Sequence, residues 1–297
     1  MALLQRMRGS SGDSPLPLVA INHLICAGRV GEAAEELAKA LEVAQTDRAG
    51  EPQREQPFNR NGHVSLLLAL GRVGEARRVL EEGASNRLSL LGALKLAAVE
   101  GSPEGLRAAA TAMEAVASWP FLDGVLAQYA APILAHAGDA EAAGRLAAAT
   151  QANPNRPGYD PTSSTLLLAL EAWGRGDRAK AREGFATLAG HADGDVRYLG
   201  QLLTGDLAFA GGDCPGAITA LEGARAIRWT TAMGGPWTWS ITGVLRKLAA
   251  CYEKTGDLAR ARERNDELLR RWAVADPDLP ALVEARATRD RIRQATP

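Results

Sequence analysis

The sequence predicts an all-α protein in which helical hairpins stack into an α-solenoid closed by a C-terminal capping helix. Apolar residues recur at the three- and four-residue spacing of amphipathic helices, and the period-two alternation of strands is almost absent. A glycine interrupts this pattern about every 38 residues, and a small residue usually follows five positions later, where a second helix would cross the first closely. The recurring glycines are Gly28, Gly71, Gly101, Gly138, Gly176, Gly212 and Gly256, and the residues five positions later are Ala33, Ala76, Leu106, Ala143, Ala181, Ala217 and Ala261.

The clearest hairpin lies near the C-terminus. Leu245, Leu248 and Tyr252 fall on one face of a helix, Gly256 ends that helix, and Asp257 can cap the next one. Two amphipathic helices joined by a tight turn cannot bury both apolar faces alone, so this hairpin needs neighbours of the same kind.

The remaining hairpins follow from the same pattern. The first two share the identical turn sequence GRVGEA at 28–33 and 71–76, which indicates an internal repeat. The core must be built mainly from alanine and leucine, since 46% of the chain is apolar and only 5% is aromatic. The paired helices are expected at 17–27 with 34–44, 64–70 with 77–83, 88–100 with 106–117, 121–137 with 141–150, 165–175 with 178–189, 196–211 with 215–227, and 245–255 with 258–272.

The domain organisation follows from the segments between these helices. Residues 1–14 are rich in Gly and Ser and are expected to be flexible, the solenoid of about seven hairpins covers 15–275, and the capping segment covers 276–297 with a charged helix at 281–294. Three longer connections lie on the same edge of such a solenoid, since each runs from a second helix to the next first helix. These connections are 46–60, 151–164 and 229–239.

The residues resemble the tetratricopeptide repeat (TPR) family in degenerate form. The likeness is carried by Ala249 and Tyr252 in the last hairpin, the Gly256-Asp257 turn, and Ala261 beyond it. Asn265 departs from the family pattern by standing at a large apolar position. The resemblance implies a right-handed solenoid whose first helices line a concave groove that binds extended peptides. Residues 256–293 also resemble the helical-repeat tails of bacterial signalling proteins, including some Ser/Thr kinases, although no kinase motif is present.

The composition excludes several classes of partner and setting. A formal net charge of −1 gives no field that would attract nucleic acid or an anionic membrane, and no apolar run approaches the length of a membrane span. Cys26, Cys214 and Cys251 form no paired motif, so neither a disulfide framework nor a zinc site is expected. We therefore expect a cytoplasmic protein, and the preference for Arg over Lys is consistent with a bacterial, GC-rich genome.

Catalytic motifs are not found, so we expect neither an enzyme nor a bound cofactor or metal. The segment Gly174–Ala179 fits G-x-G-x-x-A, but a helix precedes it and Gly176 is already a repeat turn, whereas a dinucleotide site requires a strand before the glycines. The four histidines, His23, His63, His136 and His191, fall in four different hairpins and are read as exposed or groove-lining.

The resemblance to the TPR family places candidate partner-binding residues on the first helix of each hairpin. They mix polar groups with two large aromatics, as protein-binding surfaces do. The candidates are Asn22, Asn61, Lys95, Gln128, His136, Trp173, Asp206, Phe209, Arg246 and Glu253. A carboxylate clamp of the kind found in one TPR subtype is disfavoured, because Leu18 and Gly62 stand where a Lys and an Asn are needed.

The segment 229–239 offers a second candidate surface at the loop edge. It contains Trp229, Trp237 and Trp239, and tryptophan is enriched at binding hot spots. The favoured interpretation is nevertheless that these rings fill a gap between the last two hairpins, because Trp is mostly buried in proteins.

Three functions from different classes remain open. The leading hypothesis is a non-catalytic scaffold or adaptor that binds a protein or peptide in the groove or at the loop edge. The alternative is a regulatory sensor in which the solenoid holds a small ligand or signalling peptide, which a closed pocket near Trp173, Phe209 and Trp237 would favour over an open groove. An enzyme of unrecognised type is the least favoured, and a histidine converging with two acids in one cleft would support it.

Overall fold

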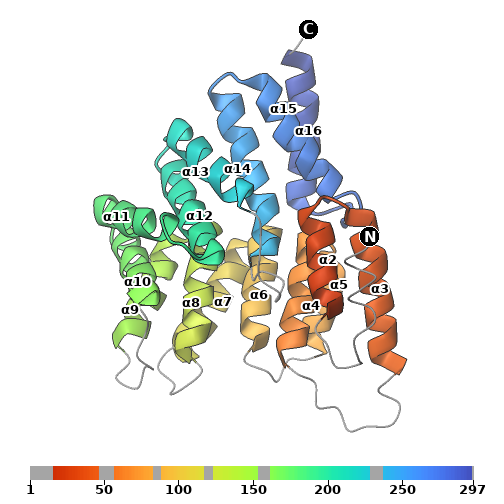
Figure 1. Ribbon diagram of the computed structural model, residues 1–297, viewed down its shortest axis with the longest axis horizontal. Helices are drawn as coiled ribbons and strands as arrows, with labels where there is room; N and C mark the ends of the chain where they lie inside the picture. The colour runs from red at the N-terminus through yellow and green to blue at the C-terminus, as the bar shows by residue number, and fades with distance from the viewer. Residues whose placement is uncertain are drawn as a thin grey trace.

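The computed structural model describes residues 16–46, 57–82, 88–116, 123–152, 161–227 and 237–295. Among these residues the secondary structure is helical, with fifteen α-helices, one 3-10 helix and no strand, so the all-α prediction is confirmed (Figure 1). The elements are α2 Leu16–Cys26, α3 Val30–Thr46, α4 Pro57–Ala69, α5 Val73–Glu81, α6 Leu88–Glu100, α7 Pro103–Val116, α8 Asp123–His136, α9 Ala140–Ala152, α10 Pro161–Gly174, α11 Arg178–Ala189, α12 Gly194–Ala210, α13 Cys214–Ala226, η2 Thr238–Ser240, α14 Ile241–Lys254, α15 Leu258–Arg271 and α16 Pro280–Ala295.

The turn glycines take the backbone conformation that their role requires. All seven predicted turn glycines have positive φ, between 68° and 99°, which costs a residue with a Cβ more than it costs glycine. At Gly176 the Asp177 amide donates to the Ala172 carbonyl and closes α10. The Asp177 carboxylate then accepts from the Lys180 amide, at 3.1 Å, and caps α11. One Gly-Asp pair thus ends one helix and starts the next.

The predicted close crossing within each hairpin is also present. The six alanines that follow the turn glycines by five residues are fully buried, and Leu106 takes the same place in the third hairpin. Each first helix packs against the second helix that follows it. Small side chains at these positions let the two backbones approach, which explains a core built from alanine and leucine.

The hairpins form two rows that lie one above the other (Figure 1). The chain runs along the lower row from α2 to α10 and returns along the upper row from α11 to α16, so that α14 to α16 lie beside the N-terminal hairpins. The contacts agree, because α8 packs against α12 and α6 packs against α16.

Three backbone contacts join the two ends of the chain. Arg271 Nη1 donates to the Ile25 carbonyl at 2.6 Å, and the Asp276 amide donates to the Gly71 carbonyl at 3.0 Å. The Gly74 amide donates to Asp276 Oδ2 at 2.7 Å. These partners are separated by more than 200 residues in sequence, so the ends are in direct contact.

The cysteine prediction was wrong. Cys214 and Cys251 are paired as a disulfide that links α13 to α14. They lie 37 residues apart, about one repeat length, so stacking of consecutive hairpins brings them together although no local motif does. Disulfides are typical of oxidising compartments, and the pairing therefore gives no support to a reducing setting.

The predicted C-terminal helix can be compared with the structure, whereas the predicted flexible N-terminus cannot. The C-terminal helix is present as α16, where Leu282, Ala285 and Ile292 are buried. Residues 1–14 and Trp229 lie outside the described residues. Within the described residues no helix is long and apolar enough to cross a membrane.

Candidate functional site

The first helices of the hairpins form an inner layer, and several predicted groove residues are enclosed within it. Asn22, Lys95, His136 and Asp206 are buried, with at most 5% of each residue exposed. The structure thus places polar side chains on the inner layer but covers them with the other half of the chain.

The remaining candidates are more scattered. Trp173 is buried inside its own hairpin, where its ring packs edge-on against Phe185. Phe209 is partly exposed, Arg246 is half-buried, and Glu253 is half-buried in an ion pair with Arg291. The side chains of Asn61 and Gln128 lie outside the described residues.

Three helices bring a buried polar cluster together at the centre of the molecule. His136 ends α8, Asp206 lies in α12, and Lys247 lies in α14. His136 Nδ1 is 2.8 Å from Asp206 Oδ2, and Lys247 Nζ donates to Asp206 Oδ1 at 2.6 Å. Lys247 also donates to the His136 carbonyl at 2.7 Å, so that it satisfies the C-terminal end of α8. We name His136, Asp206 and Lys247 the central cluster.

The charges in the central cluster follow from burial and from these contacts. Burial raises the pKa of Asp206, but His136 and Lys247 outweigh it and hold that pKa below its usual range. Burial lowers the pKa of His136 and of Lys247, and the nearby Arg246 adds to both effects. A neutral His136 facing a carboxylate carries its proton on Nδ1, so Nε2 is left with a lone pair.

Gly243 makes the approach of α14 to His136 possible. A Cβ added at Gly243 would lie 2.4 Å from His136 Nε2, far inside van der Waals contact. The Trp239 ring packs edge-on against the His136 ring, with centroids 5.5 Å apart. The position and orientation of the imidazole are thus set by groups on both sides.

A short segment, Trp237–Ser240, lies against the inner layer of the N-terminal half. It packs against α2, α4 and α14. Thr238 Oγ1 donates to Asn22 Oδ1, and Ser240 Oγ donates to the Trp237 carbonyl at 2.6 Å. Since Ser240 has one proton, Tyr198 OH is the donor in its 2.8 Å contact with Ser240 Oγ.

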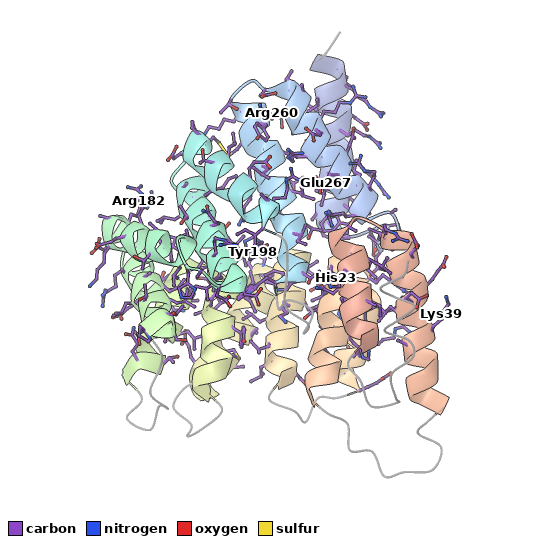
Figure 2. All side chains as sticks on the ribbon, viewed as in Figure 1. His23, Lys39, Arg182, Tyr198, Arg260 and Glu267 are labelled. Carbon is purple, nitrogen blue, oxygen red and sulfur yellow. A yellow bond between two sulfur atoms is a disulfide. The ribbon has the colours of Figure 1, made fainter. Side chains whose placement is uncertain are left out.

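The aromatic side chains of this segment are also enclosed. Trp237 lies 6.3 Å from Tyr129 of α8 between ring centroids, and both Trp237 and Trp239 are almost fully buried. Figure 2 shows the labelled Tyr198 in the middle of the molecule, between the two rows. These two rings are buried as expected, but they pack against α8 and the N-terminal half, whereas the sequence suggested a gap between the last two hairpins. We name Trp237–Ser240 the inner segment.

A small cavity of about 30 Å³ adjoins the central cluster. It has room for about two water molecules. Trp239 and Trp272 line it, and their indole N–H groups have no hydrogen-bond partner among the described residues. The lining residues are Ala98, Val99, His136, Ala137, Trp239, Thr242, Gly243, Arg246, Lys247, Trp272 and Ala281.

The described residues offer little for metal or dinucleotide chemistry. They contain no group of three or more His, Cys, Asp or Glu side chains that could hold a metal ion. The Gly174–Ala179 segment follows α10 rather than a strand, and Gly174 faces the backbone of Gly144, where an added Cβ would come within 2.7 Å of its Cα. A dinucleotide turn instead follows a strand and leaves its first glycines open to the pyrophosphate.

Sequence reasoning missed Lys247, Gly243, Tyr198 and Trp272. The one available signal was Lys247, a lysine within the apolar stretch that includes Leu245 and Leu248. Its partners Asp206 and His136 lie 41 and 111 residues earlier in the sequence. They come together only because the second half of the chain folds back over the first.

Comparisons with known proteins returned no match, whether with protein-family models, with curated proteins or with solved structures.

Proposed function

We propose that the protein is a non-catalytic protein- or peptide-binding module with a TPR-like, right-handed solenoid fold, and that its inner layer is the binding surface. The observation that carries the proposal is the inner segment. Trp237–Ser240 is a short stretch, three residues of which form the 3-10 helix η2, and it contacts helices of both chain halves through aromatic rings and hydroxyl groups. A bound peptide would use the same kinds of contact in a groove lined by helices.

The chemistry of the inner layer supports peptide recognition. Asn22 and Tyr198 supply hydrogen bonds to side chains of the inner segment, and Tyr129 supplies an aromatic surface for Trp237. Tryptophan and tyrosine dominate binding hot spots, since they bury large areas at low cost in rotamer entropy. We infer that a partner presents aromatic and hydroxyl side chains at close spacing. The near-neutral charge of the chain favours such a protein partner over nucleic acid.

The inner segment competes with an added peptide for the same surface. A tethered segment acts at an effective concentration of millimolar order, so it blocks a peptide of micromolar affinity. Replacement of Trp237 and Trp239 by Ala removes the competing rings and leaves the inner-layer helices in place.

The test uses the full chain and a synthetic peptide with the sequence of residues 234–242. We expect the Trp237→Ala/Trp239→Ala variant to bind the labelled peptide in fluorescence anisotropy, and the wild type to bind it at least tenfold more weakly. A peptide with both tryptophans replaced by Ala is the matched control. If circular dichroism shows that the double variant is poorly folded, Thr238→Val replaces it. This variant loses one hydrogen bond and keeps both tryptophan rings, so its affinity for the peptide should lie between those of the wild type and the double variant. A folded variant that does not bind the peptide refutes the proposal.

A second candidate function, that of a regulatory sensor holding a small ligand, is favoured by the cavity beside the central cluster. The cavity lies where α6, α8, α14 and α16 meet, so an occupant would touch both halves of the chain. A ligand that binds one arrangement of the halves better than another shifts the equilibrium between them. Small-angle scattering with and without ligand tests this candidate, and an unchanged radius of gyration at saturation opposes it.

A further inference from the structure

The cavity beside the central cluster is rich in hydrogen-bond donors. Two indole N–H groups without described partners, those of Trp239 and Trp272, belong to rings in its wall. Arg246 and Lys247 also line it. The Lys247 ammonium already donates to Asp206 Oδ1 and to the His136 carbonyl, and the Thr242 hydroxyl donates to the Trp239 carbonyl at 3.2 Å. Buried polar groups in native proteins nearly always have partners, so an unpartnered donor on a ring of the cavity wall points to an occupant that accepts hydrogen bonds.

The charge around the cavity is positive. No Asp or Glu is among its lining residues. Asp206 pairs with Lys247, which leaves Arg246 as the one lining cation for which the described residues provide no ion-pair partner. One uncompensated positive charge matches an anion that carries a single negative charge, and it repels a metal cation.

The size and access of the cavity limit the occupant further. A volume of about 30 Å³ holds roughly two water molecules, which matches the size of a small ion. The buried lining residues Trp239, Trp272 and Lys247 lie deep, and Arg246 is partly exposed to solvent. An anion can thus enter beside Arg246 and approach the indole N–H groups.

We propose that this cavity is a binding site for a small monovalent anion of the size of chloride or formate. Arg246 supplies the charge, the indole rings of the cavity wall supply donors, and the anion joins α6, α8, α14 and α16. This proposal names the class of ligand for the second candidate function, the regulatory sensor. Any regulatory role of the site rests on that proposed function. Anion binding itself is independent of that function and of peptide binding.

The site also explains the unusual placement of His136. Its Nε2 lone pair faces Gly243 at the cavity, and Asp206 of α12 with Lys247 and Arg246 of α14 are the charged groups around it. A bound anion adds a negative charge there and favours a proton on Nε2. Binding is therefore expected to tighten as the pH falls toward the ordinary titration range of histidine.

The test is isothermal titration of the full chain with sodium chloride and sodium formate, at an ionic strength held constant with sodium sulfate. We expect saturable binding with a dissociation constant of millimolar order, and at least tenfold weaker binding in Arg246→Gln. Arg182→Gln is the matched control, because Arg182 is exposed and lies at the far left of the molecule in Figure 2, and it should leave binding unchanged.

A second readout keeps the proposal testable if Arg246→Gln folds poorly. The His136 ring proton resonances of the wild type should shift with chloride or formate and not with equivalent sulfate. No saturable heat and no shift with either anion would overturn the proposal, as would an Arg246→Gln variant that binds like the wild type. If binding occurs and the radius of gyration stays constant, the site stands and the sensor function fails.

Discussion

Removal of the Lys247 charge tests whether the central cluster holds the two halves of the chain together. Lys247→Met keeps the length of the side chain but leaves Asp206 without its 2.6 Å partner and the His136 carbonyl without its donor. Breaking a buried ion pair by removing one partner costs about 3–5 kcal/mol. A protonated His136 can form an ion pair with Asp206 and so compensate part of the lost positive charge. We therefore expect a cost at the lower end of that range.

The loss is measured by urea unfolding followed by circular dichroism. With a slope of about 3 kcal/mol per molar urea, a loss of about 3 kcal/mol moves the midpoint down by about 1 M. Asp206→Leu combined with Lys247→Met removes both charges, and it should recover most of the loss, because a buried pair can often be replaced by apolar residues at little cost. A midpoint shift below about 0.3 M for Lys247→Met would refute the reasoning.

The pH dependence of the same variant gives a second check with a defined sign. In the wild type the pKa of His136 is lowered, so the unfolded chain takes up more protons near pH 6.5 and stability falls as the pH falls through that range. In Lys247→Met the His136–Asp206 pair should raise that pKa, which makes the variant relatively more stable at pH 6 than at pH 8. Equal dependence of stability on pH in the two proteins would contradict the conclusion that Lys247 helps to lower the pKa of His136.

Three further predictions concern single features of the fold. Cys214→Ser should lower the free energy of unfolding by about 3–5 kcal/mol, as loss of a cross-link between residues 37 apart implies, and dithiothreitol should lower the wild type to a similar level while leaving the variant unchanged. Burial lowers the pKa of Lys95 to about 8, so stability should rise as the pH goes from about 8 to about 10.5. Lys95→Met should reduce this rise in urea unfolding, and the part that remains comes from Lys247, whose pKa burial also lowers. Gly243→Ala should displace the His136 ring and weaken anion binding at least tenfold in calorimetry, whereas Gly31→Ala, where an added Cβ meets nothing within 4 Å, should not.

The local architecture could be predicted from the sequence because its signals are local. The positions of Gly176 and Asp177 follow from the backbone geometry of a single turn, and Ala181 follows from the crossing of two helices that the turn joins. The same reasoning located all seven turns. The prediction of a turn depends only on residues within one hairpin. It therefore holds even where other hairpins match the repeat pattern poorly.

The candidate site could be predicted only in part. The register places His136, Asp206 and Arg246 on the inner layer, but the meeting of His136 and Asp206 with Lys247 depends on the curvature of the whole array. The curvature is the sum of small rotations between successive hairpins, and it cannot be predicted from any single residue. For the same reason the sequence suggested an open groove, whereas the inner layer is covered by the returning half of the chain.

The contacts that close the molecule include buried polar groups beside the apolar rings of Trp237 and Trp239, and this bears on function. The central cluster, the Asn22–Thr238 pair and the bond from Arg271 to the Ile25 carbonyl all use groups that water can solvate when the halves separate. An apolar interface exposed in the same way would lose about 25 cal/mol for each Å² uncovered, with no compensating hydration. The polar part of the closure therefore lowers the cost of opening relative to a wholly apolar interface of the same area. Under the two proposals, a partner peptide at the inner segment would favour separation of the halves, and an anion beside Arg246 would favour closure.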